Sequence, residues 1–250
     1  MLKIIVHGLG RLGRSVCDLA ATDTSEYGIV AGIDIATDTD PGFPVYTDLA
    51  DCTQAAHVVV DCSVAPAVRG VVSRALAKRL PLVICTTALD DATMATIHAA
   101  AQEIPIFLSA NMSIGIHLMS RLSQMAAKAL SGAYDIEIIE KHHGGKLDAP
   151  SGTANMLATG IVDTIGDRDL VYDRSGRRQK RAATEIGMHA IRGGSMVGEH
   201  TVLFAGEGET LEITHNASSR EIYARGILRA AKLVATKPAG LYGMDDLLHE

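Results

Sequence analysis

The chain has 250 residues, of which 47% are hydrophobic and 21% are charged, so it is long enough for one large core or two modest domains. Its formal net charge of −6 argues against a nucleic-acid partner, because such a partner presents negative phosphates of its own. The chain has no Trp and only 4% aromatic residues, which argues against a surface on which bases stack.

The cysteines and the apolar runs indicate the cellular compartment in which we expect the protein. The four cysteines lack the spacing of metal ligands, and two of them lie inside apolar runs, so we expect reduced thiols and no metal site. No apolar run reaches the length of a membrane span, and the N-terminal residues lack the long apolar region of a signal peptide. We therefore expect a cytoplasmic protein without a membrane partner.

The first 110 residues alternate apolar runs with helical patterns. The runs predict buried strands, and the patterns between them predict helices, with strands at residues 2–7, 29–33, 58–62, 82–86 and 106–109 and helices at residues 14–21, 67–78 and 91–102. Strands that alternate with helices imply βαβ units and a parallel sheet with both faces covered. The sequence therefore predicts an α/β fold with an N-terminal doubly wound parallel sheet of the Rossmann type.

The pattern changes after about residue 112. Further elements are predicted there, with helices at residues 116–130, 153–165 and 219–234, strands at residues 134–140, 186–191, 200–204 and 210–214, and a hairpin turn at Glu207-Gly208. Residues 167–181 are rich in Asp and Arg and are expected to form an exposed loop. We expect an inserted α+β domain on an open mixed sheet over residues 113–219, after which residues 220–250 return to the first domain.

A glycine-rich turn follows the first predicted strand. Gly8, Gly10 and Gly13 fit the pattern G-x-G-x-x-G, in which they permit a tight turn, the close approach of a pyrophosphate and close helix packing. Asp34 ends the second predicted strand, where a carboxylate can accept hydrogen bonds from ribose hydroxyls. The combination favours a dinucleotide-binding domain over residues 1–112. The structural alternative is a plain glycine-rich connection between a strand and a helix.

A dense set of chemical groups occupies residues 141–154. His142 and His143 can supply a proton donor that works near neutral pH, and Lys146 supplies a fixed positive charge. The following Pro-Ser-Gly-Thr segment begins a predicted helix, whose backbone N–H groups and dipole attract anions. The set indicates a site that holds a small carboxylate substrate and protonates it. Ordinary N-capping by Ser151 and a solvated surface lysine are the structural alternatives.

Several blocks of the sequence resemble the 4-hydroxy-tetrahydrodipicolinate reductase family of bacterial lysine biosynthesis. The family opens with a glycine turn and Arg-Met/Leu-Gly-Arg, which residues 10–14 match. Its signature Glu-x-His-His-x-x-Lys-x-Asp-Ala-Pro-Ser-Gly-Thr-Ala is matched by residues 140–154, and two later blocks by residues 192–202 and 211–220. The resemblance spans nearly the whole chain, and the central signature is long and chemically specific.

The resemblance implies an activity and a set of residues that carry it. The family reduces 4-hydroxy-tetrahydrodipicolinate to tetrahydrodipicolinate with NADH or NADPH, and its members are homotetramers that assemble through the second domain. His142 matches the family's proton donor, Lys146 belongs with it in the catalytic set and also binds substrate, and His143 matches a group that contacts a substrate carboxylate. The remaining positions expected to bind substrate are Ser151, Gly152 and Thr153.

The resemblance also places the cofactor beyond the carboxyl ends of the first domain's strands. The expected contacts come from the glycine turn, the second strand and two later loops, at Gly8, Gly10, Arg11, Leu12, Gly13, Asp34, Thr86, Thr87, Ala110, Asn111 and Met112. One of these loops is commonly Thr-Thr-Gly in the family, whereas this chain has Ala88, whose methyl group could narrow the approach or shift the loop.

Asp34 bears on the choice between the two cofactors. A 2′-phosphate would bring negative charge against its carboxylate, which favours NADH. Many relatives carry an arginine directly after the acidic residue, whereas this chain has Ile35 and then Ala36. We expect NADH to be preferred and NADPH to bind more weakly.

Two other functions are open on the sequence. A different two-domain amino-acid dehydrogenase would share the fold but gives no account of the doubled histidine and the Ser-Gly-Thr segment. A non-catalytic dinucleotide sensor would be expected to lack the proton donor or to carry a basic DNA-binding module, and neither is found.

Overall fold

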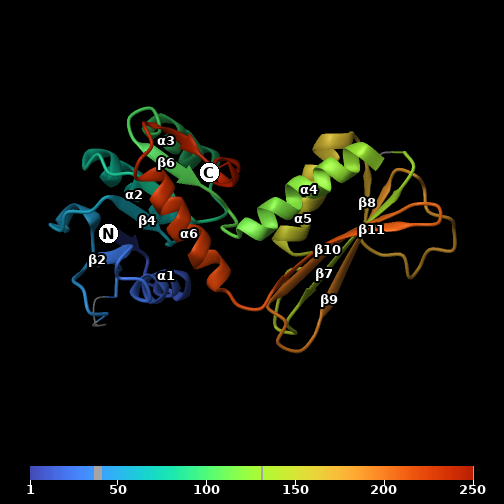
Figure 1. Cartoon of the computed structure of the whole chain (residues 1–250), viewed down its shortest axis with the longest axis horizontal. Coiled ribbons are helices and arrows are strands. Elements are labelled where there is room, and N and C mark those ends of the chain that lie inside the picture. The colour runs from blue at the N-terminus through green and yellow to red at the C-terminus, as the bar shows by residue number, and fades with distance from the viewer. Residues whose placement is uncertain (37–40, 131, 250) are drawn as a thin grey trace. The chain divides into compact units, whose positions relative to one another are not determined.

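The computed structural model describes residues 1–36, 41–130 and 132–249 of the chain. The chain divides into two compact units (Figure 1). Unit 1 consists of residues 1–114 and 221–250, and unit 2 consists of residues 115–220.

Among its described residues, unit 1 forms a seven-stranded parallel sheet with the order β12-β6-β5-β4-β1-β2-β3. The strands are β1 (Leu2–His7), β2 (Tyr27–Ile33), β3 (Val45–Tyr46), β4 (Val58–Asp61), β5 (Leu82–Ile84), β6 (Pro105–Leu108) and β12 (Gly240–Tyr242). The chain adds β2 and β3 on one side of β1 and then resumes with β4 on the other side. This reversal confirms the predicted doubly wound sheet, and folds of this kind bind ligands at such a switch point.

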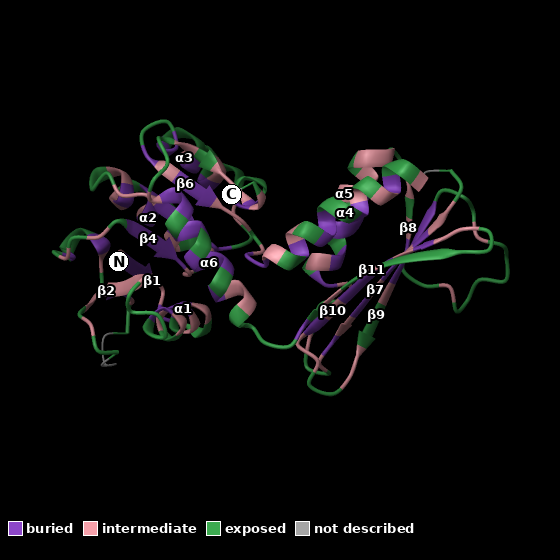
Figure 2. Cartoon of the chain, viewed as in Figure 1, coloured by how far each residue is buried: buried purple, intermediate pink, exposed green. Residues whose placement is uncertain are grey.

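Helices cover both faces of this sheet, which explains its uninterrupted apolar strands. On one face lie α1 (Arg11–Ala21), α6 (Glu221–Val234) and α7 (Met244–Leu248), and on the other lie α2 (Ala65–Ala77), α3 (Asp91–Ala100) and the short 3-10 helix η1 (Leu49–Asp51). Alternate residues of β1 enter the two cores, with Ile4 and Val6 on the first face and Ile5 on the second. The strands at the centre of the sheet are buried (Figure 2).

Unit 2 forms a five-stranded mixed sheet among its described residues, with the order β11-β10-β7-β9-β8. Its elements are α4 (Ile114–Leu130), β7 (Asp135–His142), α5 (Gly152–Ile165), β8 (Asp169–Val171), β9 (Glu185–Arg192), β10 (Gly198–Ala205) and β11 (Thr210–Ala217). β10 is antiparallel to β7 and β11, whereas β9 is parallel to β7 and β8. This confirms the predicted open mixed sheet. The core lies between the sheet and the two helices, with Ile138, Leu157 and Phe204 among its fully buried residues.

β7 shows how the sequence places polar groups at one end of this core. Its burial alternates strictly, and Ile136, Ile138, Glu140 and His142 form the buried face. Residues two apart on a strand point to the same side, so Glu140 and His142 continue the row of the two isoleucines. A carboxylate and an imidazole therefore enter the interior of unit 2 where the strand ends.

The structure differs from the sequence prediction at the edges of both sheets. The prediction that residues 167–181 form a loop is wrong at Asp169–Val171, which pair with β9 as the edge strand β8. Charged residues surround two apolar side chains of this strand, of which Leu170 packs against the core of unit 2 and Val171 is buried. The short elements β3, β12 and α7 are also absent from the prediction, because each is too short to display a period.

Candidate functional site

The glycine turn lies between β1 and α1, at the carboxyl edge of the sheet of unit 1. Gly8 has a φ of +86°, and a Cβ added there would lie 2.9 Å from the backbone of Cys62. A Cβ on Gly13 would lie 2.0 Å from the carbonyl oxygen of Gly8, so a larger residue would push the helix off the turn. A Cβ on Gly10 would meet no atom of the described chain within 4 Å. The turn is therefore tight on its inner side and open at Gly10, as a pyrophosphate cradle needs to be.

Asp34 follows β2 and is tied to this turn. Its Oδ2 accepts a hydrogen bond from the Leu9 N–H (2.7 Å), and its Oδ1 accepts one from the Ala36 N–H (3.0 Å). Arg14 folds back on the same segment, because its Nε donates to the Leu9 carbonyl oxygen (3.0 Å). Backbone donors thus fix the carboxylate beside the turn, and the next side chain, Ile35, is uncharged and 94% exposed.

A second carboxylate, Asp61, ends the central strand β4 and is fully buried. Its Oδ1 accepts a hydrogen bond from Ser63 Oγ (2.6 Å) and lies 3.1 Å from His7 Nδ1, while its Oδ2 accepts one from Thr86 Oγ1 (2.7 Å). The side chain of Thr86 is therefore turned inward, whereas Thr87 is exposed. Asp61 is not among the predicted site residues, although a carboxylate at the end of an apolar strand must find partners when it is buried.

The loop after β5 holds Ala88 in a backbone conformation that favours glycine. This residue has a φ of +58°, which is left-handed and which glycine adopts without strain. An alanine in this conformation costs stability relative to glycine.

The segment after β6 carries three predicted cofactor contacts. The Asn111 carbonyl oxygen accepts a hydrogen bond from Ser109 Oγ (2.8 Å), and its side-chain oxygen accepts one from the Ser113 N–H (2.9 Å). Ala110 is exposed. Met112 is only 3% exposed and belongs to the core of unit 1, so a contact from this residue to a cofactor would come from its backbone.

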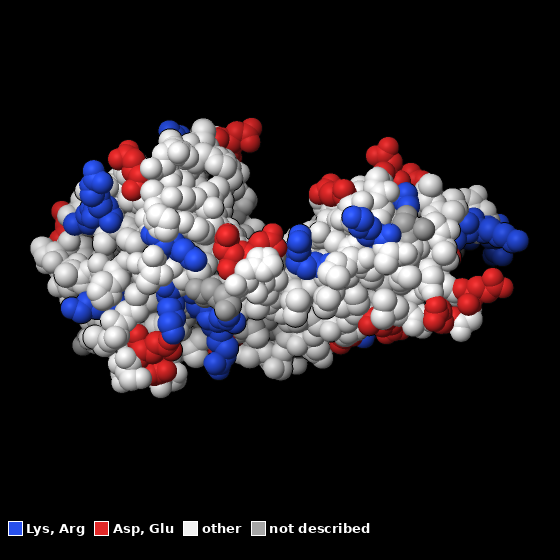
Figure 3. Space-filling model, turned by 45° about the horizontal axis from the view of Figure 1, so that its top comes forward, with Lys and Arg blue, Asp and Glu red and all other residues white. Residues whose placement is uncertain are grey.

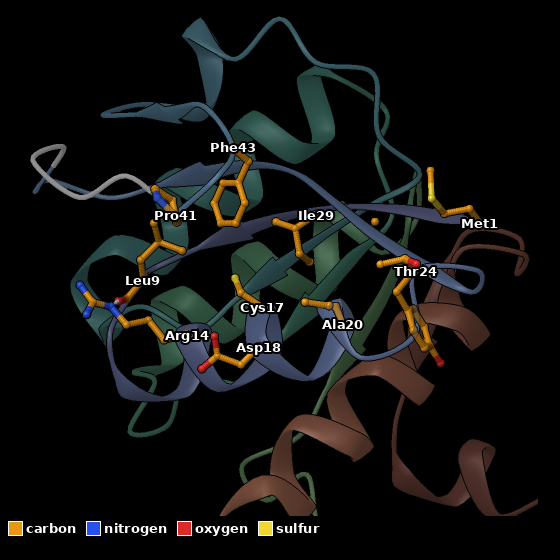
Figure 4. A pocket seen from close by; sticks show the side chains of 13 residues that line it. Met1, Leu9, Arg14, Cys17, Asp18, Ala20, Thr24, Ile29, Pro41 and Phe43 are labelled. Atoms are coloured by element: carbon orange, nitrogen blue, oxygen red, sulfur yellow. Dashed lines mark hydrogen bonds between the residues drawn. The ribbon is translucent and has the colours of Figure 1, made fainter.

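A cavity of about 640 Å³ runs along α1 in unit 1 (Figure 4). Leu9, Pro41 and Phe43 line the end near the glycine turn, and Met1 and Thr24 line the other end. The cavity therefore reaches the turn at one end and otherwise follows the groove between α1 and β2.

In unit 2, His142 lies beside the buried carboxylate of Glu140, with 2.5 Å between His142 Nδ1 and Glu140 Oε2. Arg192 is the partner of His142 on β9, and it donates to both carboxylate oxygens, from Nη1 to Oε2 (2.7 Å) and from Nη2 to Oε1 (2.6 Å). The Ser151 N–H also donates to Oε1 (3.0 Å). Burial alone would raise the pKa of Glu140, but these hydrogen bonds outweigh burial and lower that pKa. The carboxylate is therefore ionised at neutral pH.

A second histidine, His200 on β10, packs against the first. The two ring centroids are 5.2 Å apart with the rings edge to face. His200 Nε2 lies 3.0 Å from Ser151 Oγ, which also accepts the Ala154 N–H (3.2 Å) as the N-cap of α5. Burial and the neighbouring His142 lower the pKa of His200 to about 4, so this ring is neutral near pH 7. Gly198 makes room for the pair, since a Cβ there would lie 3.1 Å from His142 Nε2.

The loop between β7 and α5 carries Lys146. Its Nζ pairs with Asp148 at 2.8 Å, and this hydrogen bond lowers the pKa of the Asp148 carboxyl. The Lys146 N–H donates to the His143 carbonyl oxygen (3.1 Å), which turns the chain directly after β7. Arg192 Nη2 donates to the Asp148 carbonyl oxygen (2.6 Å), so the loop is held to the end of β9. A Cβ on Gly152 would meet no described atom within 4 Å, and the start of α5 is open there.

Unit 2 thus collects the predicted substrate residues around one end of its sheet and the start of α5, namely His142, His143, Lys146, Ser151, Gly152 and Thr153. The predicted cofactor residues all lie in unit 1. The sequence analysis gives no role to Glu140, Arg192 or His200. The predicted strand at residues 134–140 ends at Glu140, and its extension to His142 in the structure places both side chains on one face. Arg192 is 52 positions from Glu140 and is brought to it by the pairing of β7 with β9.

The described residues contain no group of three or more His, Cys, Asp or Glu side chains placed to hold a metal ion. None of the helices in the described part of the chain combines the length and hydropathy that a bilayer crossing needs. All four cysteines are free thiols, and burial raises the pKa of Cys17 to about 12.

Comparison with known proteins assigns both units to one family. Residues 2–112 match the family model "Dihydrodipicolinate reductase, N-terminus", and residues 115–248 match "Dihydrodipicolinate reductase, C-terminus". The chain is 45% identical to the 4-hydroxy-tetrahydrodipicolinate reductase of Caldanaerobacter subterraneus subsp. tengcongensis (99% of this chain and 98% of the relative are covered) and 43% identical to that of Clostridium tetani (100% and 98%). The fold is similar to dipicolinate-bound dihydrodipicolinate reductase from Paenisporosarcina sp. TG-14, with a TM-score of 0.84, 23% identity and coverage of 98% and 99%. The chain therefore belongs to the dihydrodipicolinate reductase family, whose members are NAD(P)H-dependent oxidoreductases of lysine and diaminopimelate biosynthesis.

Proposed function

We propose that the chain reduces 4-hydroxy-tetrahydrodipicolinate to tetrahydrodipicolinate with NADH or NADPH, and that His142 gives the proton. The bound nicotinamide cofactor supplies the hydride. The observation that carries the proposal is the buried pairing of His142 with Glu140 beside the start of α5, within the family's signature segment. The dipicolinate bound to a relative of similar fold supports a small dicarboxylate as the substrate.

The proton donor has one nitrogen available. His142 Nδ1 faces Glu140, so Nε2 is the nitrogen left to exchange a proton with the substrate. Reduction of a conjugated imine leaves negative charge on the acceptor, and an imidazolium neutralises it by giving up a proton. An imidazole suits this step, because it can take up a proton from solvent again after each turnover.

The substrate carboxylates are proposed to bind at Lys146, at His143 and at the N-terminus of α5. Lys146 already pairs with Asp148, whose side chain is 58% exposed. A pair this open to solvent is worth about 0–1 kcal/mol, so a substrate carboxylate can replace Asp148 at little cost. At the helix start the ligands are the backbone N–H groups of Gly152 and Thr153, beside Ser151, where the helix dipole favours an anion.

The glycine turn fits a dinucleotide on its own geometry, because Gly10 is open and Gly8 and Gly13 tolerate no Cβ. We infer that the backbone from Gly10 to Gly13, with Arg11 and Leu12 between them, holds the pyrophosphate and that Asp34 holds the adenosine ribose. Five residues are proposed to line the nicotinamide end, of which Thr86 and Met112 would act through their backbones: Thr86, Thr87, Ala110, Asn111 and Met112. The uncharged Ile35 beside Asp34 supports a preference for NADH over NADPH.

Assembly is proposed to be a homotetramer in the cytoplasm, formed through residues 113–219. An apolar stripe on unit 2 supports an interface there. Leu118, Leu122 and Met125 lie on one face of α4 and are 46%, 41% and 67% exposed. Burial of such a stripe against another subunit is the usual source of stability for an obligate oligomer.

A coupled assay tests the proposed activity. Aspartate semialdehyde, pyruvate and the synthase that condenses them are mixed with the pure protein and NADH or NADPH, and the absorbance of the reduced cofactor is followed. Oxidation that requires both the synthase and the protein is expected. Failure to oxidise either cofactor would refute the proposal.

A further inference from the structure

We propose that Glu140 is a positioning residue that joins the proton donor, the substrate-binding helix start and the loop of Lys146 into one unit, with Arg192 as its counter-charge. The inference rests on the proposed function of His142, and it extends that function to two residues that touch neither the reacting atoms nor the cofactor. The buried carboxylate of Glu140 contacts all three of these parts of the site, directly or through Arg192.

The carboxylate of Glu140 is saturated with hydrogen bonds. The side chain is fully buried, and each oxygen accepts two bonds, with His142 Nδ1 and Arg192 Nη1 at Oε2 and the Ser151 N–H and Arg192 Nη2 at Oε1. A carboxylate has about four acceptor directions, so no capacity remains for water or substrate. A group so fully engaged serves to hold its partners in place.

The first consequence concerns the His142 ring. A carboxylate facing Nδ1 fixes the neutral tautomer as Nδ1–H and leaves Nε2 to exchange the proton. It also favours the imidazolium, because opposite charges attract across a buried contact. The ring is confined further by His200, 5.2 Å away, and by the backbone of Gly198.

The second consequence concerns the carboxylate-binding side of the site. Glu140 accepts the N–H of Ser151, the N-cap of α5, so it sets where the helix begins. Arg192 also donates to the Asp148 carbonyl oxygen (2.6 Å), which fixes the loop that carries Lys146. One ion pair therefore sets the distance from the proton donor to both sets of proposed carboxylate ligands.

Arg192 has an electrostatic role as well. Its bidentate guanidinium offsets part of the carboxylate charge that the His142 ring faces. His200 on β10 packs against the His142 ring, and the other titratable groups that act on His200 are His215 on β11 and Lys146 in the loop. None of these supplies an anion in place of Glu140.

The main test compares Glu140→Gln with Glu137→Gln. Glu137 lies on the same strand and also pairs with a histidine and an arginine, His189 (2.7 Å) and Arg181 (3.2 Å), but on the other face of the sheet. We expect Glu140→Gln to lower kcat by about 10–100-fold with a smaller change in KM, and to move the alkaline fall of kcat to lower pH by about one unit. We expect Glu137→Gln to leave kcat within about twofold of the parent.

Arg192→Gln is expected to move the alkaline fall of kcat in the opposite direction, because the carboxylate is then unopposed. Should Glu140→Gln fail to fold, Arg192→Lys keeps both charges, removes the bidentate contact and is expected to lower kcat by about tenfold. Unchanged kcat and pH profiles in Glu140→Gln, or shifts of the same sign in the Glu140 and Arg192 variants, would overturn the inference.

A readout without catalysis separates this inference from the proposed activity. Nitrogen-15 NMR of the neutral His142 ring is expected to show a single Nδ1–H tautomer in the parent and a mixture in Glu140→Gln. A parent without reductase activity but with this tautomer change would refute the activity and keep the positioning role. An active parent whose tautomer is the same in both proteins would refute the positioning role alone.

Discussion

At the scale of single residues, His142 is the group whose loss should affect the chemistry most. Replacement by Gln keeps the size of the side chain and some hydrogen bonding but removes the titrating proton. We expect kcat to fall by about 10²–10⁴-fold, the usual contribution of a general acid, with an unchanged circular dichroism spectrum. Turnover within about twofold of the parent would remove His142 from the mechanism.

Asp34 and Ile35 should decide the cofactor preference. In the parent we expect a lower KM for NADH than for NADPH, because the carboxylate repels a 2′-phosphate and Ile35 offers no cation. Ile35→Arg places a guanidinium where it can pair with that phosphate. We expect the ratio of the KM for NADPH to the KM for NADH to fall by about tenfold. Ile35→Gln has a similar length without charge and serves as the control. A parent KM that is clearly lower for NADPH would contradict this role of Asp34.

Replacement of Ala88 by glycine should stabilise the protein, although glycine usually lowers stability. Its φ of +58° strains an L-residue, so Ala88→Gly is expected to raise the free energy of unfolding by up to about 1 kcal/mol. Ala95 lies exposed inside α3, and Ala95→Gly should lower the same quantity by about 1 kcal/mol. Urea denaturation of the two variants measures both effects. The same sign for both would show that the strain at residue 88 is not significant.

At the scale of elements, the packing of β10 against the start of α5 should make unit 2 sensitive to acid. The pKa of His200 is lowered by burial to about 4, below the 6.5 of an unfolded histidine. Between these values the unfolded chain binds more protons, so the free energy of unfolding should fall as the pH is lowered from 6.5 toward 4, by up to about 3 kcal/mol. The contribution is fully present above pH 6.5.

Denaturation at pH 7.5 and at pH 5 checks this expectation. His200→Gln should lose this part of the pH dependence, while His98→Gln, on the surface of α3, should keep it. If His200→Gln loses as much stability as the parent between the two pH values, another group is responsible.

The elements also show what a single sequence can predict. Apolar runs predict β1 and β4 well, a helical pattern predicts α4, and the residues of β7 alternate visibly in the amino-acid sequence itself. The short strand β8 is decided by its pairing with β9, which no local pattern reveals. The site follows the same rule. His142 and Lys146 lie in one contiguous signature, whereas Arg192 joins them only because β7 and β9 are neighbours in register.

At the scale of the whole molecule, the proposed homotetramer can be tested through its mass. On the face shown in Figure 3, Lys and Arg side chains are interspersed with Asp and Glu on both units. Light scattering at micromolar concentration is expected to give four times the 26.4 kDa mass of the chain. Leu122→Glu introduces charge into the apolar stripe of α4 and should shift the mass downward if that stripe is buried between subunits. A mass of 26.4 kDa for the parent would refute the tetramer.

The division of unit 1 into two segments has a consequence for how the protein is made. Residues 1–114 leave the ribosome first, but α6 and β12, which complete their core and sheet, lie in residues 221–250. Unit 2 is continuous and can fold as soon as it emerges, since domains generally fold as units during synthesis. Until α6 and α7 are made, α1 is the only described helix present to cover the side of the sheet that carries Val6, Val60 and Phe107. The unit whose first segment is translated first is thus completed last, and part of its apolar core stays uncovered in the interval.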